Sequence, residues 1–239
     1  MSVDEAAADR PVSNQYGQLV GPIVATELPR PRPDGRPLRG AYVEAHRLRA
    51  EHAAELFAAL CGAEDEPLWT YRQTTRPISI DQLTDAVLAP MIAHETSVAY
   101  VFSPEGRAGE GVAVLHPIVP EQGVVEISNV IFARSMQRTR AATEAIHLLL
   151  AEVFALGYRR VEWKCDSLNE PSRRAALRLG FTEEGRFRQH LVTKGRNRDT
   201  DWFSIIDTEW PAIDRRQRRW LDASNFDADG QQLLPLSRH

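Results

Sequence analysis

The sequence has few cysteines and no long apolar run, and these absences exclude several classes of protein. Only Cys61 and Cys165 occur among 239 residues, which gives neither a disulfide framework nor a metal-ligand spacing. No stretch approaches the roughly 20 apolar residues of a membrane span, and the acidic start "MSVDEAAADR" has no apolar signal core. We therefore expect a cytoplasmic protein with no bound metal and no membrane contact.

Lysine is also scarce, so nearly all of the positively charged side chains are arginines. Of the 29 basic residues only Lys164 and Lys194 are lysines, so the cations are almost all guanidinium groups, which suit forked contacts with phosphate or carboxylate. The net charge of -4 argues against a nucleic-acid partner, because such proteins carry a basic excess. With 43% hydrophobic residues, the chain is long enough for one well-buried domain.

The two ends of the chain differ from its middle. Residues 1–37 contain six prolines and no sustained hydrophobic period, which predicts an extended arm. Residues 38–210 have the alternating and helical patterns of a single folded domain. Residues 211–239 are expected to form a C-terminal helix and a tail whose last dozen residues are frayed.

The first half of the domain is predicted to run β-α-α-β-β-β. A strand begins at Leu38, and "TSVAYVF" and "GVAVLHP" form a hairpin that leads into a strand from Val124 to Phe132. Ser79 and Gln82 have the spacing of a capping box at the start of the second helix. The buried faces of the two helices are predicted to carry Leu56, Phe57 and Leu60, and then Leu83, Val87, Met91 and Ile92.

The second half begins with the segment "MQRTRAATEAIHLLL", which changes from basic to apolar within about one helical turn. A helix that starts there and ends at Gly157 presents unpaired backbone N–H groups and a positive dipole end, which suit an anion. A strand "YRRVEWKCD" follows, then a short helix capped by Asn169 and ended by Gly180. Two further strands and a helix with Trp210 and Trp220 complete the pattern.

The strand, "QRTRAATEA", helix, strand, "N-x-x-S" and "GF" in this order resemble the GCN5-related N-acetyltransferase (GNAT) superfamily. The closest likeness is to its RimJ/RimL-type branch of ribosomal-protein alanine and serine N-acetyltransferases. The resemblance covers roughly residues 38–206. It implies an α/β (α+β) fold with a mixed, mostly antiparallel central sheet that is splayed at its middle strands, with helices on both faces. It also implies an acyltransferase that uses acetyl-coenzyme A.

The resemblance assigns a cofactor site to the start of the anion-binding helix. The family pattern Q/R-x-x-G-x-G/A, which holds the coenzyme A pyrophosphate, falls on Gln137, Arg138, Thr139, Arg140, Ala141 and Ala142. Arg140 replaces the first glycine, and its guanidinium can itself reach a phosphate. The remaining residues implied to contact the cofactor are Val130, Ile131, Phe132, Thr143, Asn169, Ser172 and Arg173.

The resemblance also suggests how the reaction is catalysed. Glu126 stands where family members often carry the glutamate that removes a proton from the amine. Backbone N–H groups near Ser128 to Val130 are implied to stabilise the thioester oxygen. Ala176 occupies the position of the usual tyrosine, so Ser172 is the candidate group for the departing sulfur. The acceptor groove is implied to include Trp69, Tyr71, Arg72 and Trp202.

Several alternatives remain open at this stage. Glu126 can be a structural carboxylate, Ser172 a first-turn helix serine, and the loop aromatics plugs of the core edge. Cys165 and His190 are interpreted as structural residues. The acceptor amine can belong to a small molecule or to a protein N-terminus, and a homodimer is left open. The chain can also be a coenzyme A-binding module with little turnover, or a protein-interaction domain.

Overall fold

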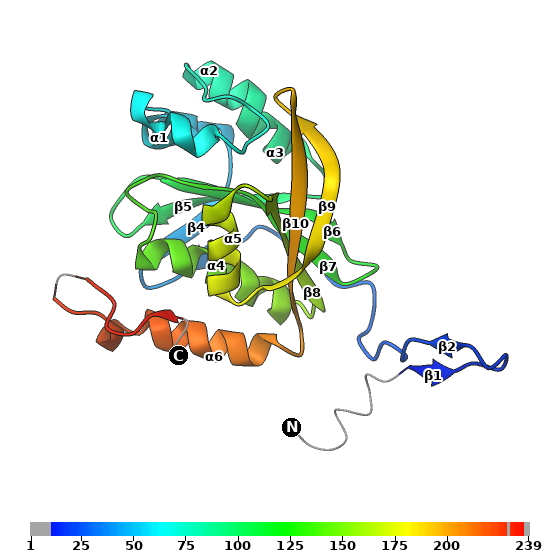
Figure 1. Cartoon of the computed structure of the whole chain (residues 1–239). Coiled ribbons are helices and arrows are strands. Elements are labelled where there is room, and N and C mark those ends of the chain that lie inside the picture. Colours follow the sequence, from blue (N-terminus) through cyan, green and yellow to red (C-terminus); the bar gives the residue numbers. More distant parts are fainter. Residues whose placement is uncertain (1–10, 229, 237–239) are drawn as a thin grey trace.

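An eight-stranded sheet forms the centre of the computed structural model, which describes residues 11–228 and 230–236 (Figure 1). Its strand order is β3-β4-β5-β6-β7-β8-β10-β9, and every neighbouring pair is antiparallel except β7 and β8. The strands are β3 (Leu38–Arg39), β4 (Val43–Arg47), β5 (Val98–Pro104), β6 (Gly111–Val119), β7 (Val124–Phe132), β8 (Arg160–Asp166), β9 (Thr182–Thr193) and β10 (Arg196–Ile206). The predicted mixed, mostly antiparallel sheet is confirmed.

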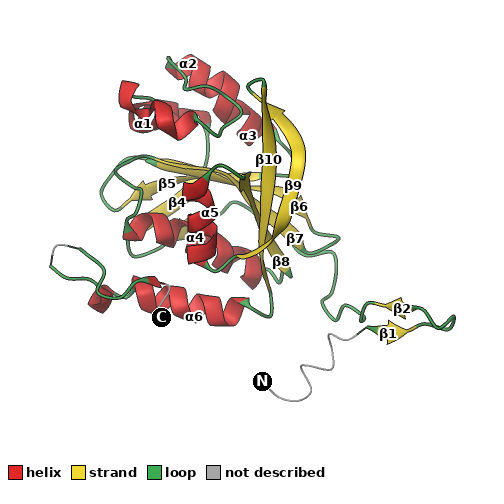
Figure 2. Cartoon of the chain, in the orientation of Figure 1, coloured by secondary structure: helices red, strands yellow, loops and turns green. Residues whose placement is uncertain are grey.

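The middle of the sheet is buried on both faces. In β5, Tyr100 and Phe102 enter one hydrophobic core while Ala99 and Val101 enter the other, because successive side chains point to opposite faces of a strand. Helices therefore cover both faces, and Figure 2 shows the two helical layers. One layer holds α1 (Ala53–Leu60), α2 (Ile80–Leu83) and α3 (Ala89–Ala93); the other holds α4 (Arg140–Ala155), α5 (Glu170–Leu179) and α6 (Trp210–Leu221).

Short 3-10 and π-helical segments connect the helices of the first layer. Capping residues set the boundaries of α5 in the second layer. The 3-10 helices Ala50–His52 and Ala63–Trp69 flank α1, a π-helical turn Thr84–Leu88 links α2 to α3, and Ala223–Asn225 follows α6. Asn169 caps α5 by accepting a hydrogen bond from the Ser172 N–H at 3.2 Å. Gly180 ends the same helix with a φ of 105°, which glycine adopts without steric cost.

β7 and β8 separate soon after they meet. They pair only from Val124 to Glu126, and β7 then continues to Phe132 without β8 beside it. A bulge interrupts the other side of β7 at the same level, where Asn129 has a φ of 53°. The edge of β7 that faces β8 is therefore left without a strand partner beyond Glu126, which is the splay that the sequence resemblance implied.

Two expectations about packing were wrong. Ile92 is 39% exposed rather than on the buried side, because the π-helical turn Thr84–Leu88 changes the helical phase before α3. The part of the C-terminal tail that the structure describes is anchored near its end rather than frayed, although Leu233 and Leu234 are exposed. Leu236 is fully buried and the Asn225 side chain accepts from the Leu234 N–H at 3.0 Å, so the chain folds back onto α6. Residues 237–239 lie outside the described residues.

The described part of the arm is extended, as predicted, except for a small hairpin of β1 (Val12–Ser13) and β2 (Leu19–Val20), which projects from the body in Figure 1. Nearer the domain, Arg36 pairs with Glu152 of α4 at 2.6 Å. The division into arm, domain and C-terminal segment remains a proposal. Ile213 of α6 belongs to the main core, so the C-terminal helix packs against the domain. No helix in the described residues is both long and apolar enough to cross a membrane.

Candidate functional site

A cleft opens where β7 and β8 separate. Its volume is about 1660 Å³, larger than the roughly 300–1,000 Å³ that one drug-sized ligand fills, so it has room for two ligands at once. Most of the residues singled out in the sequence meet in this cleft. They are Tyr71, Arg72, Glu126, Val130, Ile131, Phe132, Gln137, Arg138, Thr139, Arg140, Ala142, Thr143, Asn169 and Ser172.

The start of α4 lies at one end of the cleft with backbone donors to spare. Thr139 is the N-cap, and its hydroxyl oxygen accepts from the Ala142 N–H at 3.3 Å. Within the described residues, the N–H groups of Arg138, Arg140 and Ala141 have no backbone or side-chain acceptor. Free N–H groups at the positive end of a helix dipole form an anion site. The structure thus supports the anion-binding junction that "QRTRAATEA" predicts.

The backbone also explains why this junction has no glycine at position 140. Arg140 is the first residue of α4 and has helical geometry, which any residue adopts. The left-handed conformation falls on Arg138 instead, with a φ of 62°. The Arg140 guanidinium lies between two rings, 4.5 Å from the Tyr42 centroid and 4.6 Å from the Phe226 centroid. Its orientation is therefore fixed by aromatic residues from both ends of the chain.

Glu126 lies at the point where the two strands part. Its side chain is nearly buried, lines the cleft and pairs with the Lys164 Nζ at 2.7 Å. Burial raises the pKa of Glu126 above its ordinary value, and the Lys164 ammonium opposes that rise without cancelling it. A carboxylate with a raised pKa in a cleft is suited to accept a proton.

Ser172 and Asn169 lie together on the opposite wall. The Ser172 hydroxyl oxygen accepts from the Trp163 indole N–H at 3.0 Å, and the same hydroxyl also hydrogen-bonds the Cys165 sulfur. The Asn169 carbonyl oxygen caps α5, which leaves its amide N–H groups toward the cleft wall without a partner among the described residues. Cys165 lines the cleft with a nearly buried side chain, and burial raises the pKa of its thiol, so its interpretation as a structural residue stays a prediction.

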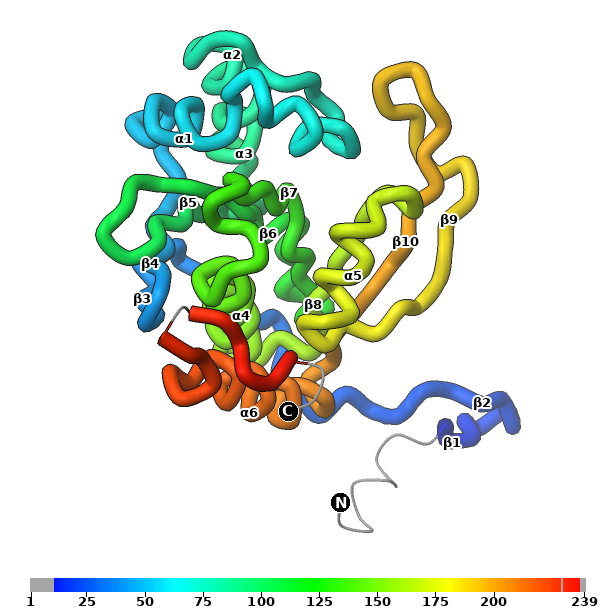
Figure 3. The backbone as a smooth tube through the Cα atoms, turned by 60° about the vertical axis from the view of Figure 1, so that its left-hand side comes forward, coloured from blue at the N-terminus to red at the C-terminus, as the bar shows by residue number. Residues whose placement is uncertain are grey.

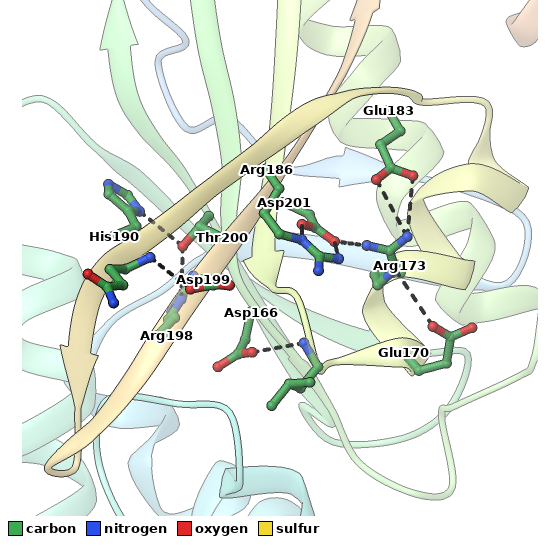
Figure 4. Close-up of polar contacts among 12 residues, drawn as sticks. Asp166, Glu170, Arg173, Glu183, Arg186, His190, Arg198, Asp199, Thr200 and Asp201 are labelled. Atoms are coloured by element: carbon green, nitrogen blue, oxygen red, sulfur yellow. Dashed lines mark hydrogen bonds and ion pairs between the residues drawn. The ribbon is translucent and has the colours of Figure 1, made fainter.

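Four of the predicted contacts lie elsewhere. Trp69 is buried in the core beneath α1, where its indole donates to the Leu60 carbonyl at 2.9 Å, and the Trp202 side chain does not line the cleft. The Ala141 side chain faces the core, so only its backbone is available. Figure 4 shows Arg173 turned toward the carboxylates of Asp201, Glu183 and Glu170 rather than into the cleft. Fully buried Asp201 needs cations, and the α5 arginines that do line the cleft are Arg174 and Arg178.

The sequence interpretation missed several cleft residues. Lys164 and Arg198 reach the cleft from β8 and β10, and the rings of His94 and His116, which meet edge to face with centroids 4.2 Å apart, also line it. The alternation of residues along "VEWKCD" places Lys164 on the face of the strand opposite to its buried residues. No local pattern shows which carboxylate Lys164 pairs with. Segments distant in the sequence bring these side chains together. The tube in Figure 3 shows α3, β8 and β10 converging on the region around β7.

Comparisons with known proteins agree with this geometry. The family description "Acetyltransferase (GNAT) domain" matches residues 44–182. A GCN5-related N-acetyltransferase from Brucella melitensis is 39% identical over 90% of this chain and 98% of its own, with a TM-score of 0.86. A probable GNAT-family acetyltransferase from Chromobacterium violaceum is 37% identical over 80% of this chain and 96% of its own, with a TM-score of 0.75.

A more distant structure shares the fold. RimJ from Mycobacterium smegmatis, solved with CoA-disulfide, is 21% identical over 76% of this chain and 91% of its own, with a TM-score of 0.63. No curated protein sequence matches the chain. The family match and the Brucella structure show that the chain belongs to the GNAT acetyltransferase family. It is accordingly an N-acetyltransferase, with acetyl-coenzyme A as the acetyl donor of the family.

Proposed function

We propose that the protein transfers an acetyl group from acetyl-coenzyme A to a primary amine by direct attack while both substrates are bound. The cleft supports this order because it is large enough for both ligands and Glu126 lies on its wall at the splay. An acyl-enzyme route has no support, since Cys165 is buried with a raised thiol pKa. We define the cofactor half of the cleft as residues 137–143 with Asn169, Ser172 and Arg174. The acceptor half comprises Tyr71, Arg72, His94, His116, Glu126, Lys164 and Arg198.

The residues of the cofactor half fit coenzyme A. The unpaired N–H groups of Arg138, Arg140 and Ala141 would hold the pyrophosphate, and the unpaired edge of β7 at residues 127–132 would pair with the pantetheine amides. Acetyl-coenzyme A supplies a thioester, whose carbonyl carbon is the atom that the amine attacks. Backbone N–H groups near Ser128 to Val130 would stabilise the negative charge that develops on its oxygen.

Glu126 would act as the base. An amine attacks only when it is neutral, and at pH 7 both α-amines (pKa about 8) and lysine-like amines (pKa about 10.4) are mostly protonated. Glu126 accepts a proton from the amine as the new C–N bond forms and the C–S bond breaks. Ser172 would donate its hydroxyl hydrogen to the departing sulfur in place of its contact with Cys165, while its oxygen keeps the hydrogen bond from the Trp163 indole N–H. The single observation that carries this mechanism is the nearly buried Glu126 at the strand splay.

The acceptor remains to be identified by experiment. We place the reaction in the cytoplasm, since both cysteines are free thiols. Release of coenzyme A thiol should be measured with a panel of amines that includes amino acids, peptides with free N-termini and a polyamine. We expect acetyl-coenzyme A to bind in calorimetry and at least one amine to accelerate thiol release. Binding without any acceleration would instead identify a coenzyme A-binding module, and failure to bind would favour an interaction domain.

A further inference from the structure

The cleft is cationic although the chain as a whole carries a net charge of -4. Only two carboxylates, Glu126 and Asp166, are among the described residues that line it. The cations on its walls are Arg72, Arg138, Arg140, Lys164, Arg174, Arg178 and Arg198. The phosphates of the cofactor would pair with the arginines near α4 and α5. Arg72, Lys164 and Arg198 lie instead in the acceptor half.

Of these two carboxylates only Asp166 is without an ion pair in the described residues. Glu126 is paired with the Lys164 Nζ at 2.7 Å, and Asp166 accepts a hydrogen bond from the Leu168 N–H at 2.9 Å. A polyamine would bring at least one additional ammonium group into this space. That ammonium would meet several guanidinium groups and at most the one unpaired carboxylate of Asp166, and like charges in a partly desolvated site repel.

Arg72 is the cation in the acceptor half that most lacks an anion. Its terminal nitrogens reach only the carbonyl oxygens of Asn129 and Val130 and the Asn129 side chain, each at 3.4 Å, which is long for a hydrogen bond. Its Nε is buried without a hydrogen-bond partner and its guanidinium lies 5.5 Å from the centroid of the Trp69 ring, but it forms no ion pair with a described residue. Burial lowers the pKa of Arg72 to about 10, as expected for a desolvated cation without a counter-ion.

Arg198 adds positive charge from the opposite wall. Its Nε donates to the Thr200 hydroxyl at 3.2 Å, and that hydroxyl also bonds His190 at 3.0 Å, as Figure 4 shows. Arg198 also forms no ion pair with a described residue, and its charge is close enough to Glu126 to lower the pKa of that carboxyl. The acceptor half therefore has one base for the amine and an excess of positive charge around it.

We propose that the acceptor amine also carries a carboxylate and that the Arg72 guanidinium binds this carboxylate, with Arg198 adding to the attraction. This inference rests on the proposed acetyl transfer and specifies its substrate class. Arg72 contacts the carbonyls of Asn129 and Val130 at the bulge of β7, so a carboxylate bound there lies beside the position that the attacking amine must occupy. The carboxylate belongs either to an amino acid or to an acidic residue near a peptide N-terminus.

Matched acceptors test the proposal on the intact protein. One arm compares alanine with alaninamide, and the other compares the amidated peptides Ala-Glu-Ala, Ala-Gln-Ala and Ala-Lys-Ala, with spermidine alongside. We expect the kcat/KM of the carboxylate member to exceed that of its neutral partner by about 10- to 100-fold in one arm, as for a charge-assisted contact. The arm that shows the effect identifies the source of the carboxylate. A ratio below about 2 in both arms, or a preference for spermidine or the lysine peptide, would overturn the proposal.

Substitution of Arg72 distinguishes direct binding from a general charge effect. Arg72→Gln should reduce the ratio to near 1 without changing acetyl-coenzyme A affinity. Arg196→Gln, an exposed arginine of β10 outside the cleft, is the matched control and should keep the wild-type ratio. A ratio that survives Arg72→Gln would refute the role of this residue.

Product binding keeps the test independent of turnover. With coenzyme A bound, calorimetry should show that N-acetyl-Ala-Glu-Ala-amide or N-acetylalanine binds at least 10-fold more tightly than its neutral partner, and only when Arg72 is present. If no amine is acetylated but this difference is found, the proposed function fails and the carboxylate site stands. Equal affinities for the charged and neutral products would reject the carboxylate site.

Discussion

The cofactor half of the cleft takes its main contacts from consecutive residues 137–143, whereas the acceptor half takes Arg72, Glu126, Lys164 and Arg198 from four separate segments. The cofactor half is a helix N-terminus, whose donors exist as soon as the helix forms. The acceptor half exists only after the sheet is assembled, because its charges meet across the splay between β7 and β8. Variation in the acceptor half can therefore change specificity without disturbing the anion site.

The largest expected effect comes from removing the base in the acceptor half. Glu126→Gln keeps the shape but cannot accept the proton, so turnover at neutral pH should fall by about 10²- to 10⁴-fold with acetyl-coenzyme A affinity nearly unchanged. Stopped-flow thiol release and calorimetry would measure the two quantities. Higher pH should recover part of the loss, and more for an α-amine than for a lysine-like amine.

Glu162→Gln is the control for that variant, since Glu162 lies on β8, pairs with Arg160 at 2.9 Å and does not line the cleft. It should retain nearly wild-type turnover. Wild-type rates for Glu126→Gln over pH 7–9 would exclude Glu126 as the base. A loss of acetyl-coenzyme A affinity in that variant would show that the two halves are not independent.

Substitutions in the cofactor half should have the opposite effect, because they should change the affinity for acetyl-coenzyme A and leave turnover nearly unchanged. Replacing both Arg138 and Arg140 by Ala should weaken acetyl-coenzyme A binding by about 1–3 kcal/mol, while turnover at saturating cofactor changes little. Calorimetric titration measures the affinity, and Arg215→Ala on the exposed face of α6 serves as the control. Unchanged affinity would mean that the backbone N–H groups alone hold the anion.

The pH profile should respond to Lys164. Glu126 works only when ionised, so kcat/KM falls as pH falls through its raised pKa. Lys164 lowers that pKa, and therefore Lys164→Gln should move the acidic limb of the profile upward by about one pH unit or more. The double variant with Glu126→Gln should lose this limb. A limb that stays in place would show that another group titrates.

The smallest expected effect belongs to Ser172, at the boundary of the two halves. Ser172→Ala removes a hydrogen bond to the leaving sulfur, so turnover should fall by about 10-fold, equivalent to about 1.4 kcal/mol. Raising the pH should not restore it, because the change does not concern the amine proton. The pH dependence of single-turnover rates measures this, and recovery at high pH would assign Ser172 to proton removal instead.

The local patterns in the sequence predicted the elements well. Asn169 acts as a helix N-cap, and Gly157 and Gly180 follow the ends of their helices, as short-range chemistry dictates. Some predictions failed for a local reason, as where the π-helical turn leaves Ile92 exposed, and others because of a long-range interaction. Buried Asp201 on β10 attracts Arg173, and the core beneath α1 takes up Trp69.

The sequence by itself determined the order of strands and helices, the anion-binding start of α4 and the family resemblance, because each depends on residues within a few positions of one another. Only the tertiary structure decided that Lys164 neutralises Glu126, that Arg140 is held between Tyr42 and Phe226, and that Arg72 lacks an anion. These outcomes depend on which side chains meet across the sheet. Coulombic and desolvation effects act through space, so spacing along the chain does not reveal them.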